Sequence, residues 1–283
     1  MGFEGGNATP DVISEMPGPN YVKKKHLGQI KYEDLILKVD ASMSKVFYQW
    51  VKDTVEQRYL RKNGAIIVAD YNYRELSRIE FFNGLISEVT FPALDATSRD
   101  RTYLQVKITP ATTRFTRAGS TAQGKPYTAT AAQTHKLWLP SNYRLKIDGL
   151  DNATPWTHKI SALTFKMPVV AAKIGDRPDS SRVPAGFEVS NLTAWVASSH
   201  SESLYQWFEN FVIRGNSADN MEKSGTLEYF DPTLKEVLFR LTFDHLGIFK
   251  LSSEMPVSGS STLPQDKAEM YVENIRFDFS APW

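Results

Sequence analysis

The chain contains no cysteine among its 283 residues. Disulfide frameworks, zinc sites built from thiolates and cysteine nucleophiles are therefore excluded. It also lacks any apolar run approaching the roughly 20 residues that a membrane-spanning helix needs. Residues 1–6 lack the basic and apolar regions of a signal peptide. We expect a protein that is made and kept in the cytoplasm and has no membrane partner.

Chemical signatures are missing as well. The phosphate-binding and esterase patterns rich in glycine do not occur. The formal net charge of +1 gives no reason to expect a polyanionic partner. Asp95, Arg99, Asp100 and Arg101 form a charged loop without the context of a catalytic site. We therefore predict no enzyme activity, no catalytic residue, no cofactor and no metal. The five histidines have no pair at the spacing of a zinc site: His26, His135, His158, His200 and His245.

What the sequence does contain is an internal repeat. The segment Tyr48-Gln49-Trp50 recurs as Tyr205-Gln206-Trp207, 157 positions later, and several preceding residues match at the same offset without a gap. A unit used twice in tandem, with no catalytic signature in either copy, indicates a structural building block. The matching pairs are Leu35 with Leu192, Val39 with Val196, Ser42 with Ser199 and Ser44 with Ser201.

Each copy shows the same succession of patterns. Residues 29–39 alternate with a period close to two, which predicts a strand. A short amphipathic helix follows, capped by Ser42 or Ser44 in the first copy and by Ser201 or Ser203 in the second. Paired strands come next, at 65–69 with 79–82 and at 226–230 with 237–243, and closing strands at 103–108 and 270–279. The pattern predicts a mainly β fold with one helix beside each sheet.

The aromatic residues of the two helices are predicted to anchor the cores. They fall on the apolar face of each helix, so burial explains them better than ligand binding does. The predicted core anchors are Tyr48, Trp50, Tyr205 and Trp207.

The chain divides into four predicted segments. Residues 1–22, with Gly and Pro but no periodicity, read as an extended N-terminal arm. Residues 23–115 form domain 1, and residues 141–283 form domain 2. Residues 116–140, rich in Thr, Ala and Gly, form a linker, or a loop that docks on a neighbouring subunit.

Three stretches resemble the contractile-tail tube protein family. Residues 142–150, with Ile147-Asp148-Gly149-Leu150, and residues 159–163 are similar to the opening "F-x-V-x-I-D-G-L" hairpin of that family. Residues 25–37 resemble its "K-x-P-G-x-x-K-Y-x-x-I-T-L" strand, and residues 81–96 resemble its "F-x-N-A" and "F-D-A" motifs. The order and spacing of these motifs carry the resemblance. The opening hairpin has no counterpart before Lys23, so the first sheet is either incomplete, or completed by the arm or by a neighbour.

The resemblance implies two tandem β-barrel or β-sandwich domains, each with one lateral helix. It implies a non-enzymatic tube subunit of a phage tail or injection machine, assembled in the bacterial cytoplasm. Such subunits form stacked hexameric rings, contact sheath, baseplate or terminator proteins, and pass DNA only as cargo. The expected assembly interface comprises Gln29, Lys31, Tyr32, Phe91, Asp95, Arg99, Arg101, Arg114 and Arg117.

Two alternatives remain. A tube initiator or baseplate hub would place three chains, each with two tube-like domains, in a pseudo-sixfold ring. A peptide-binding adaptor would instead bind an extended segment at an open sheet edge by strand addition.

Overall fold

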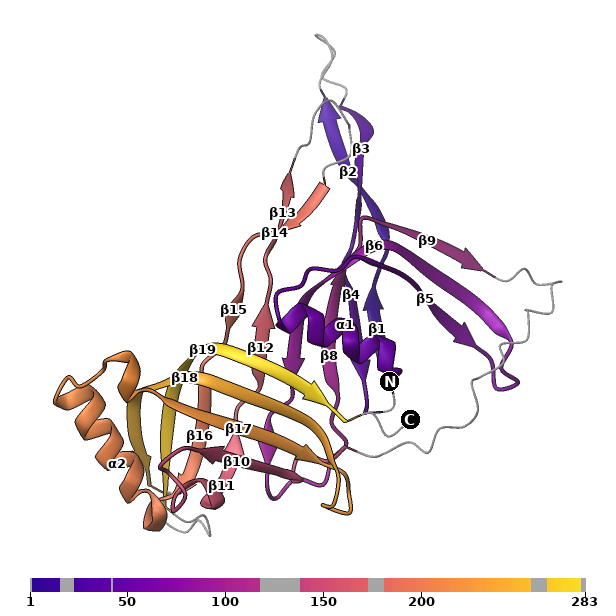
Figure 1. Cartoon of the computed structure of the whole chain (residues 1–283). Helices are drawn as coiled ribbons and strands as arrows, with labels where there is room; N and C mark the ends of the chain where they lie inside the picture. The colour runs from indigo at the N-terminus through magenta and orange to yellow at the C-terminus, as the bar shows by residue number, and fades with distance from the viewer. Residues whose placement is uncertain are drawn as a thin grey trace.

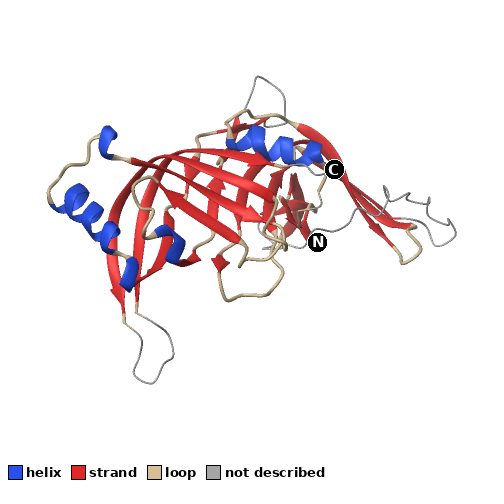
Figure 2. Cartoon of the chain, turned by 60° about the horizontal axis from the view of Figure 1, so that its bottom comes forward, coloured by secondary structure: helices blue, strands red, loops and turns tan. Residues whose placement is uncertain are grey.

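The computed structural model describes residues 2–15, 23–41, 43–117, 138–172, 181–255 and 264–280. These residues form an eight-stranded sheet, a seven-stranded sheet and two separate two-stranded hairpins, with few helices. The predicted mainly β fold is confirmed. Figure 1 shows α1 beside the first sheet and close to β19 of the second, while α2 lies far from it at the other end of the second sheet. Figure 2 shows that strands make up most of the fold. No helix in these ranges is long and apolar enough to cross a membrane.

The first copy of the repeat supplies most of the eight-stranded sheet. Its strands run in the spatial order β4-β8-β6-β5, all antiparallel. After Pro110 the chain continues as β9, which pairs with the first half of β6. The elements of the first copy are β4 (Leu35–Val39), α1 (Lys45–Val55), β5 (Lys62–Ala69), β6 (Glu75–Phe91), β8 (Leu104–Thr109) and β9 (Thr112–Arg117).

The second copy repeats this topology in the seven-stranded sheet, in the order β16-β19-β18-β17. The two hairpins also agree in detail. Gly64 pairs with Phe81 in one and Gly225 with Phe243 in the other, and each pairing shifts register just before that glycine. The internal duplication is therefore visible in the backbone. The elements are β16 (Leu192–Ala197), α2 (Glu202–Phe208), β17 (Lys223–Phe230), β18 (Val237–Glu254) and β19 (Gln265–Phe279).

The two sheets exchange strands. From the second half of the chain, β12 (Leu163–Lys166) pairs with β6, and β15 (Glu188–Val189) pairs with β12. In return, β7 (Leu94–Asp95) from the first half pairs with β11 (Thr157–Ile160) beside β16. One contiguous apolar core lies between the sheets. The division into domains 23–115 and 141–283 remains a prediction, and the two halves share both sheets and core.

The helices differ in how they contact this core. Ser44 caps α1 by accepting a hydrogen bond from the amide of Phe47, and Tyr48 and Trp50 are buried. In α2, Trp207 is buried, whereas Tyr205 is 42% exposed. The expectation that Tyr205 anchors the core is therefore wrong. The remaining helical turns are η1 (Thr154–Trp156), η2 (Ser198–His200), η3 (Glu209–Ile213) and η4 (Asp219–Met221).

The expected N-terminal arm forms strands in its described part. β1 (Gly2–Gly5) pairs with β4 and so extends the first sheet, as one of the expected alternatives required. β2 (Ala8–Glu15) and β3 (Lys24–Tyr32) form a hairpin that rises away from the sheets (Figure 1). A second hairpin joins β13 (Val169–Ala172) to β14 (Ser181–Pro184), and β10 (Tyr143–Ile147) lies at the edge of the second sheet beside β17. Most of the expected linker, residues 118–137, lies outside the described residues.

Candidate assembly surfaces

Open sheet edges are the first candidate surface. Within the described residues, β1 and β15 end the first sheet, while β10 and β7 end the second. The outer edges of β5 and β9 also have no partner strand in this part of the chain. Unpaired backbone N–H and C=O groups along an edge invite pairing with another chain. These edges can therefore take part in assembly.

The β2–β3 hairpin is the second candidate surface. Its exposed aliphatic side chains come from both strands, and Leu27, the most exposed of them, keeps 74% of its surface open. Asp11 and Lys31 form an ion pair of 2.6 Å across the hairpin. Gln29, Lys31 and Tyr32, predicted for the interface, all lie in β3. The exposed aliphatic residues are Val12, Ile13, Leu27 and Ile30.

The predicted interface includes the end of β6 and the loop that follows β7, and Phe91, the last residue of β6, does not fit this prediction. Phe91 is fully buried and its ring meets those of Phe165, Tyr229 and Phe277 at 5.4–5.8 Å. It is therefore a core residue, and no neighbouring subunit can reach it in this fold. Sequence reasoning placed it in the interface because the motif around it resembles a loop, whereas the residue itself ends a buried strand.

Asp95 gives this loop its shape. Its Oδ1 accepts hydrogen bonds from the Thr97 hydroxyl at 2.6 Å and the Thr97 amide at 2.8 Å, which hold the pKa of the carboxyl below its ordinary value. The Asp95 backbone pairs with Lys159. Arg99 and Arg101 follow and are exposed. Asp95 therefore holds the start of the loop in place, and the loop exposes the guanidinium groups of Arg99 and Arg101 to solvent.

The far end of the β5–β6–β9 region carries exposed rings and arginines. Arg114 pairs with Glu80, with its Nε 2.7 Å from the carboxylate, and Arg117 at the end of β9 is exposed. Phe115, between them, is 63% exposed. Tyr71 and Tyr73, in the turn before β6, are also exposed, and no pattern in the sequence pointed to them.

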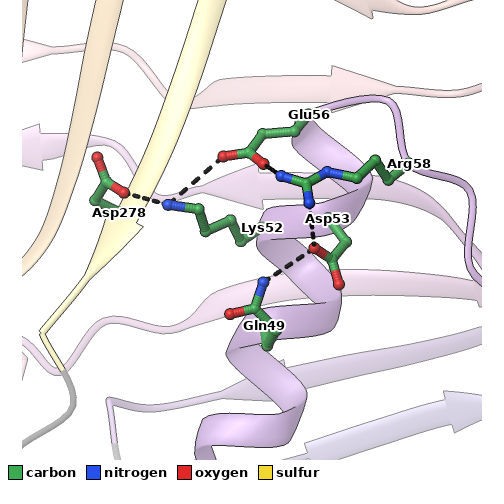
Figure 3. Close-up of polar contacts among 6 residues, drawn as sticks. All are labelled: Gln49, Lys52, Asp53, Glu56, Arg58 and Asp278. Carbon is green, nitrogen blue, oxygen red and sulfur yellow. Dashed lines mark hydrogen bonds and ion pairs between the residues drawn. The ribbon is translucent and has the colours of Figure 1, made fainter.

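The polar face of α1 joins the two halves of the chain. Lys52 pairs with Glu56 in its own helix and with Asp278 in β19 (Figure 3). Arg58 binds Glu56, and Gln49 donates a hydrogen bond of 2.9 Å to Asp53. Of these contacts, the pair of Lys52 with Asp278 links α1 to the second sheet, a relation that the sequence pattern did not reveal.

One cluster of ligand-type groups also forms in the second copy. Glu222, His245 and Glu273 bring their ligand atoms within 4.8 Å of one another. The Glu222 carboxylate is already engaged, with His245 Nδ1 at 2.7 Å and the Tyr271 hydroxyl at 2.5 Å. The pKa of His245 is raised because of its hydrogen bond to Glu222. Spacing along the sequence missed this cluster because its members lie on different elements.

An apolar groove of about 480 Å³ lies between α1, β1, β4 and β5. We call it the α1 groove. Val46 on its rim is 67% exposed, and Phe47 is half-buried. Its apolar walls include Phe3, Leu37, Met43, Val46, Phe47 and Ile66.

Residues 10–111 match the family model described as T4-like virus tail tube protein gp19. This stretch contains most of the β2–β3 hairpin and the first copy from β4 to β8. The match confirms the resemblance to the contractile-tail tube family for this part of the chain and supports a structural role of the tube type. No curated protein sequence matches the chain significantly.

Several solved structures are similar over about half of the chain. A chain of the anti-feeding prophage baseplate is 12% identical, with 49% of this chain and 93% of that chain covered and a TM-score of 0.38. A chain of the extracellular contractile injection system PVC sheath-tube complex is 12% identical, with 49% and 89% covered and a TM-score of 0.36. Hcp1 from Flavobacterium johnsoniae is 13% identical, with 49% and 96% covered and a TM-score of 0.31. TM-scores this low do not establish a shared fold.

Proposed function

We propose that this chain, whose residues 10–111 match the T4-like tail tube family, is a structural subunit of the inner tube of a contractile phage tail or injection machine. It assembles into stacked hexameric rings that enclose a hollow conduit. The observation that carries the proposal is the family match over the first copy, together with a second copy that repeats the same strand order. The assembled protein would be located in the tail of the phage or in the injection particle.

The open edges support this role physically. A long-lived monomer would be exposed to unwanted pairing along β5 and β9, whereas ring neighbours would satisfy these backbone groups. We propose that the interface includes the β3 residues Gln29, Lys31 and Tyr32, the loop residues Asp95, Arg99 and Arg101, and the β9 residues Arg114 and Arg117. The partners are copies of the same chain, a surrounding sheath protein, and baseplate or terminator proteins. DNA passes through the conduit without being specifically bound.

A tube initiator or hub is the second candidate. The observation that favours it is the duplication itself, because three chains with two tube-like copies each would supply six units to one ring. In that arrangement, rings would not stack into long tubes of this protein alone.

Negative-stain imaging and light scattering of the purified protein separate the candidates. Long hollow tubes built from six chains per ring would support the tube subunit. Isolated rings of three chains would support the initiator. A protein that stays monomeric at all concentrations tested would overturn both, and specific binding of extended peptides by that monomer would favour an adaptor that works by strand addition.

A further inference from the structure

The two copies differ in how one equivalent strand is covered. In the second copy, β10 pairs with the outer edge of β17, from Tyr143 opposite Tyr229 to Ile147 opposite Gly225. Gly225 permits this approach, because a Cβ there would come within 2.6 Å of the Lys146 carbonyl oxygen. In the first copy β5 takes the place of β17, and no strand in the described residues pairs with its outer edge.

The other strand of the hairpin, β11, does have a counterpart in the first copy. In the second copy β11 covers β16, with Ile160 opposite Ala194. In the first copy β1 covers β4, with Phe3 opposite Leu37, the residue 157 positions before Ala194. β1 is therefore the counterpart of β11. The first copy has this strand of the hairpin, and the described residues supply no counterpart of β10.

The missing strand explains the α1 groove. In the second copy, Leu145, Ile147 and Leu150 from β10 and the turn after it are buried in the core. Without such side chains the apolar walls of the first copy remain open as a groove of about 480 Å³. Phe47 on its wall is half-buried, whereas its counterpart Leu204 in the second copy is fully covered.

The shape that fits this groove is a strand with aliphatic side chains. The β2–β3 hairpin provides one, since Val12, Ile13, Leu27 and Ile30 are exposed, and in the described residues no third strand pairs with the outer edge of β2 or of β3. An isolated two-stranded hairpin is only marginally stable in water, so a hairpin of this composition gains from packing on another surface.

The geometry of the hairpin indicates which chain supplies it. The hairpin of the same chain rises away from the sheets (Figure 1). A neighbouring chain can therefore place its hairpin in the α1 groove, which a chain cannot reach with its own hairpin.

We propose that the β2–β3 hairpin of a second copy of this chain inserts into the α1 groove and pairs along β5, taking the position that β10 holds in the second copy of the repeat. The contact joins two different surfaces, so it propagates from chain to chain into a ring or a filament. It rests on the proposed function, because both require that the chain assembles with itself.

Cysteine cross-linking tests the contact, since the chain has no cysteine of its own. Leu27→Cys and Val46→Cys combined in one chain place one thiol on the hairpin and one at the groove. We expect oxidation of the assembled protein to give covalent multimers. The matched control combines Phe115→Cys with Val46→Cys, which pairs the same groove position with another exposed apolar residue, and we expect it to remain mostly uncross-linked.

A second variant measures the contribution to assembly. Leu27→Asp would place a charge in the apolar groove, and we expect the concentration needed for assembly to rise by at least about tenfold. The control Leu234→Asp changes another exposed leucine, 60% exposed against 74% for Leu27, in the turn before β18, and assembly should stay as in the parent chain. Circular dichroism should show both variants folded.

The outcomes separate the two proposals. Assembled particles that do not cross-link between positions 27 and 46, or that tolerate Leu27→Asp, overturn the hairpin contact and leave the tube proposal standing. Cross-linking of Phe115→Cys to Ala65→Cys in such particles would point to pairing of β9 with β5 instead. A parent chain that stays monomeric at every concentration overturns the proposed function, and the hairpin contact with it.

Discussion

The ring of Tyr48 in α1 packs against the ring of Phe239 in β18, with centroids 5.2 Å apart. A residue from the helix of the first copy thus lies in the core of the second. Its hydroxyl donates a hydrogen bond to the Asp40 carbonyl, and burial raises the pKa of this phenol. Tyr205, which stands at the equivalent position of α2, has no such neighbour ring within the described part of the chain, and it donates a hydrogen bond to Asp266.

Because the core is shared, we expect the described fold to unfold in one cooperative step. Phe239→Ala should lower the free energy of unfolding by about 3–5 kcal/mol, the usual range for removing a buried ring. Phe249→Ala in the same strand is the matched control, since Phe249 is 41% exposed, and its effect should be much smaller. Hydrogen exchange of β6 and of β18 should be accelerated together in Phe239→Ala. Two separate transitions, one for each copy, would contradict a shared core.

The ion pair between Lys52 and Asp278 should contribute little by itself. Asp278 keeps 55% of its side-chain surface exposed, and such pairs contribute about 0.2–1 kcal/mol. A double-mutant cycle with Lys52→Met and Asp278→Asn, followed by chemical denaturation, should give a coupling energy in this range. The coupling should shrink at high salt, because salt screens exposed charges. A coupling that exceeds this range and resists salt would show that the pair is more shielded from solvent than its exposure indicates.

Asp266, in the second copy, should make the stability of the fold depend on pH. It is buried, which by itself raises its pKa, but hydrogen bonds from Ser201 and Ser253, both at 2.5 Å, and from Tyr205 hold the pKa below the ordinary value. A depressed folded-state pKa adds stability above the unfolded-state pKa of about 4, and this is lost as the pH falls through the folded-state value.

The variant Asp266→Asn should therefore be less stable at pH 7 by about 1–3 kcal/mol, the cost of disturbing a buried hydrogen-bonded group. The difference from the parent chain should narrow as the pH falls below about 4. Asp100→Asn, in an exposed loop, serves as the control and should leave the pH profile unchanged. A constant difference between Asp266→Asn and the parent at all pH values would show that Asp266 is not charged in the folded protein.

The repeat and the strand patterns could be read from the sequence because they depend on local periodicity. Trp50 and Trp207 lie in the core, since the apolar faces of their helices have the expected spacing. A further signal was present but missed: Lys62-Asn63-Gly64 and Lys223-Ser224-Gly225 begin equivalent hairpins, four positions beyond the offset of the helices. Aligning them would have shown that the second copy carries an insertion after its helix.

The exchange of strands between the sheets could not be predicted in the same way. Periodicity shows which side of a strand is apolar but not which sheet the strand joins. Leu163 and Phe165 in β12 alternate as a strand of the second half should, yet they pair beside β6. Phe91 was expected at the assembly interface, because periodicity does not show that β12 pairs beside β6 and places the Phe165 ring against it. Tyr205 was expected to be buried because it matches Tyr48 in the repeat, but the two residues lie in different environments.

The exposed arginines of the loop after β7 provide a test of the proposed interface that does not depend on the hairpin. Arg99→Glu combined with Arg101→Glu should change the free energy of unfolding by no more than about 0.5 kcal/mol, because both side chains are exposed. If they face acidic groups of a neighbouring subunit, the reversal of charge should weaken assembly, most strongly at low salt. Lys166→Glu with Lys235→Glu makes the same change in charge at two exposed positions outside the proposed interface. Light scattering over a range of salt concentrations should show a defect only in the arginine variant, and equal defects in both would mean that net charge, not this loop, governs assembly.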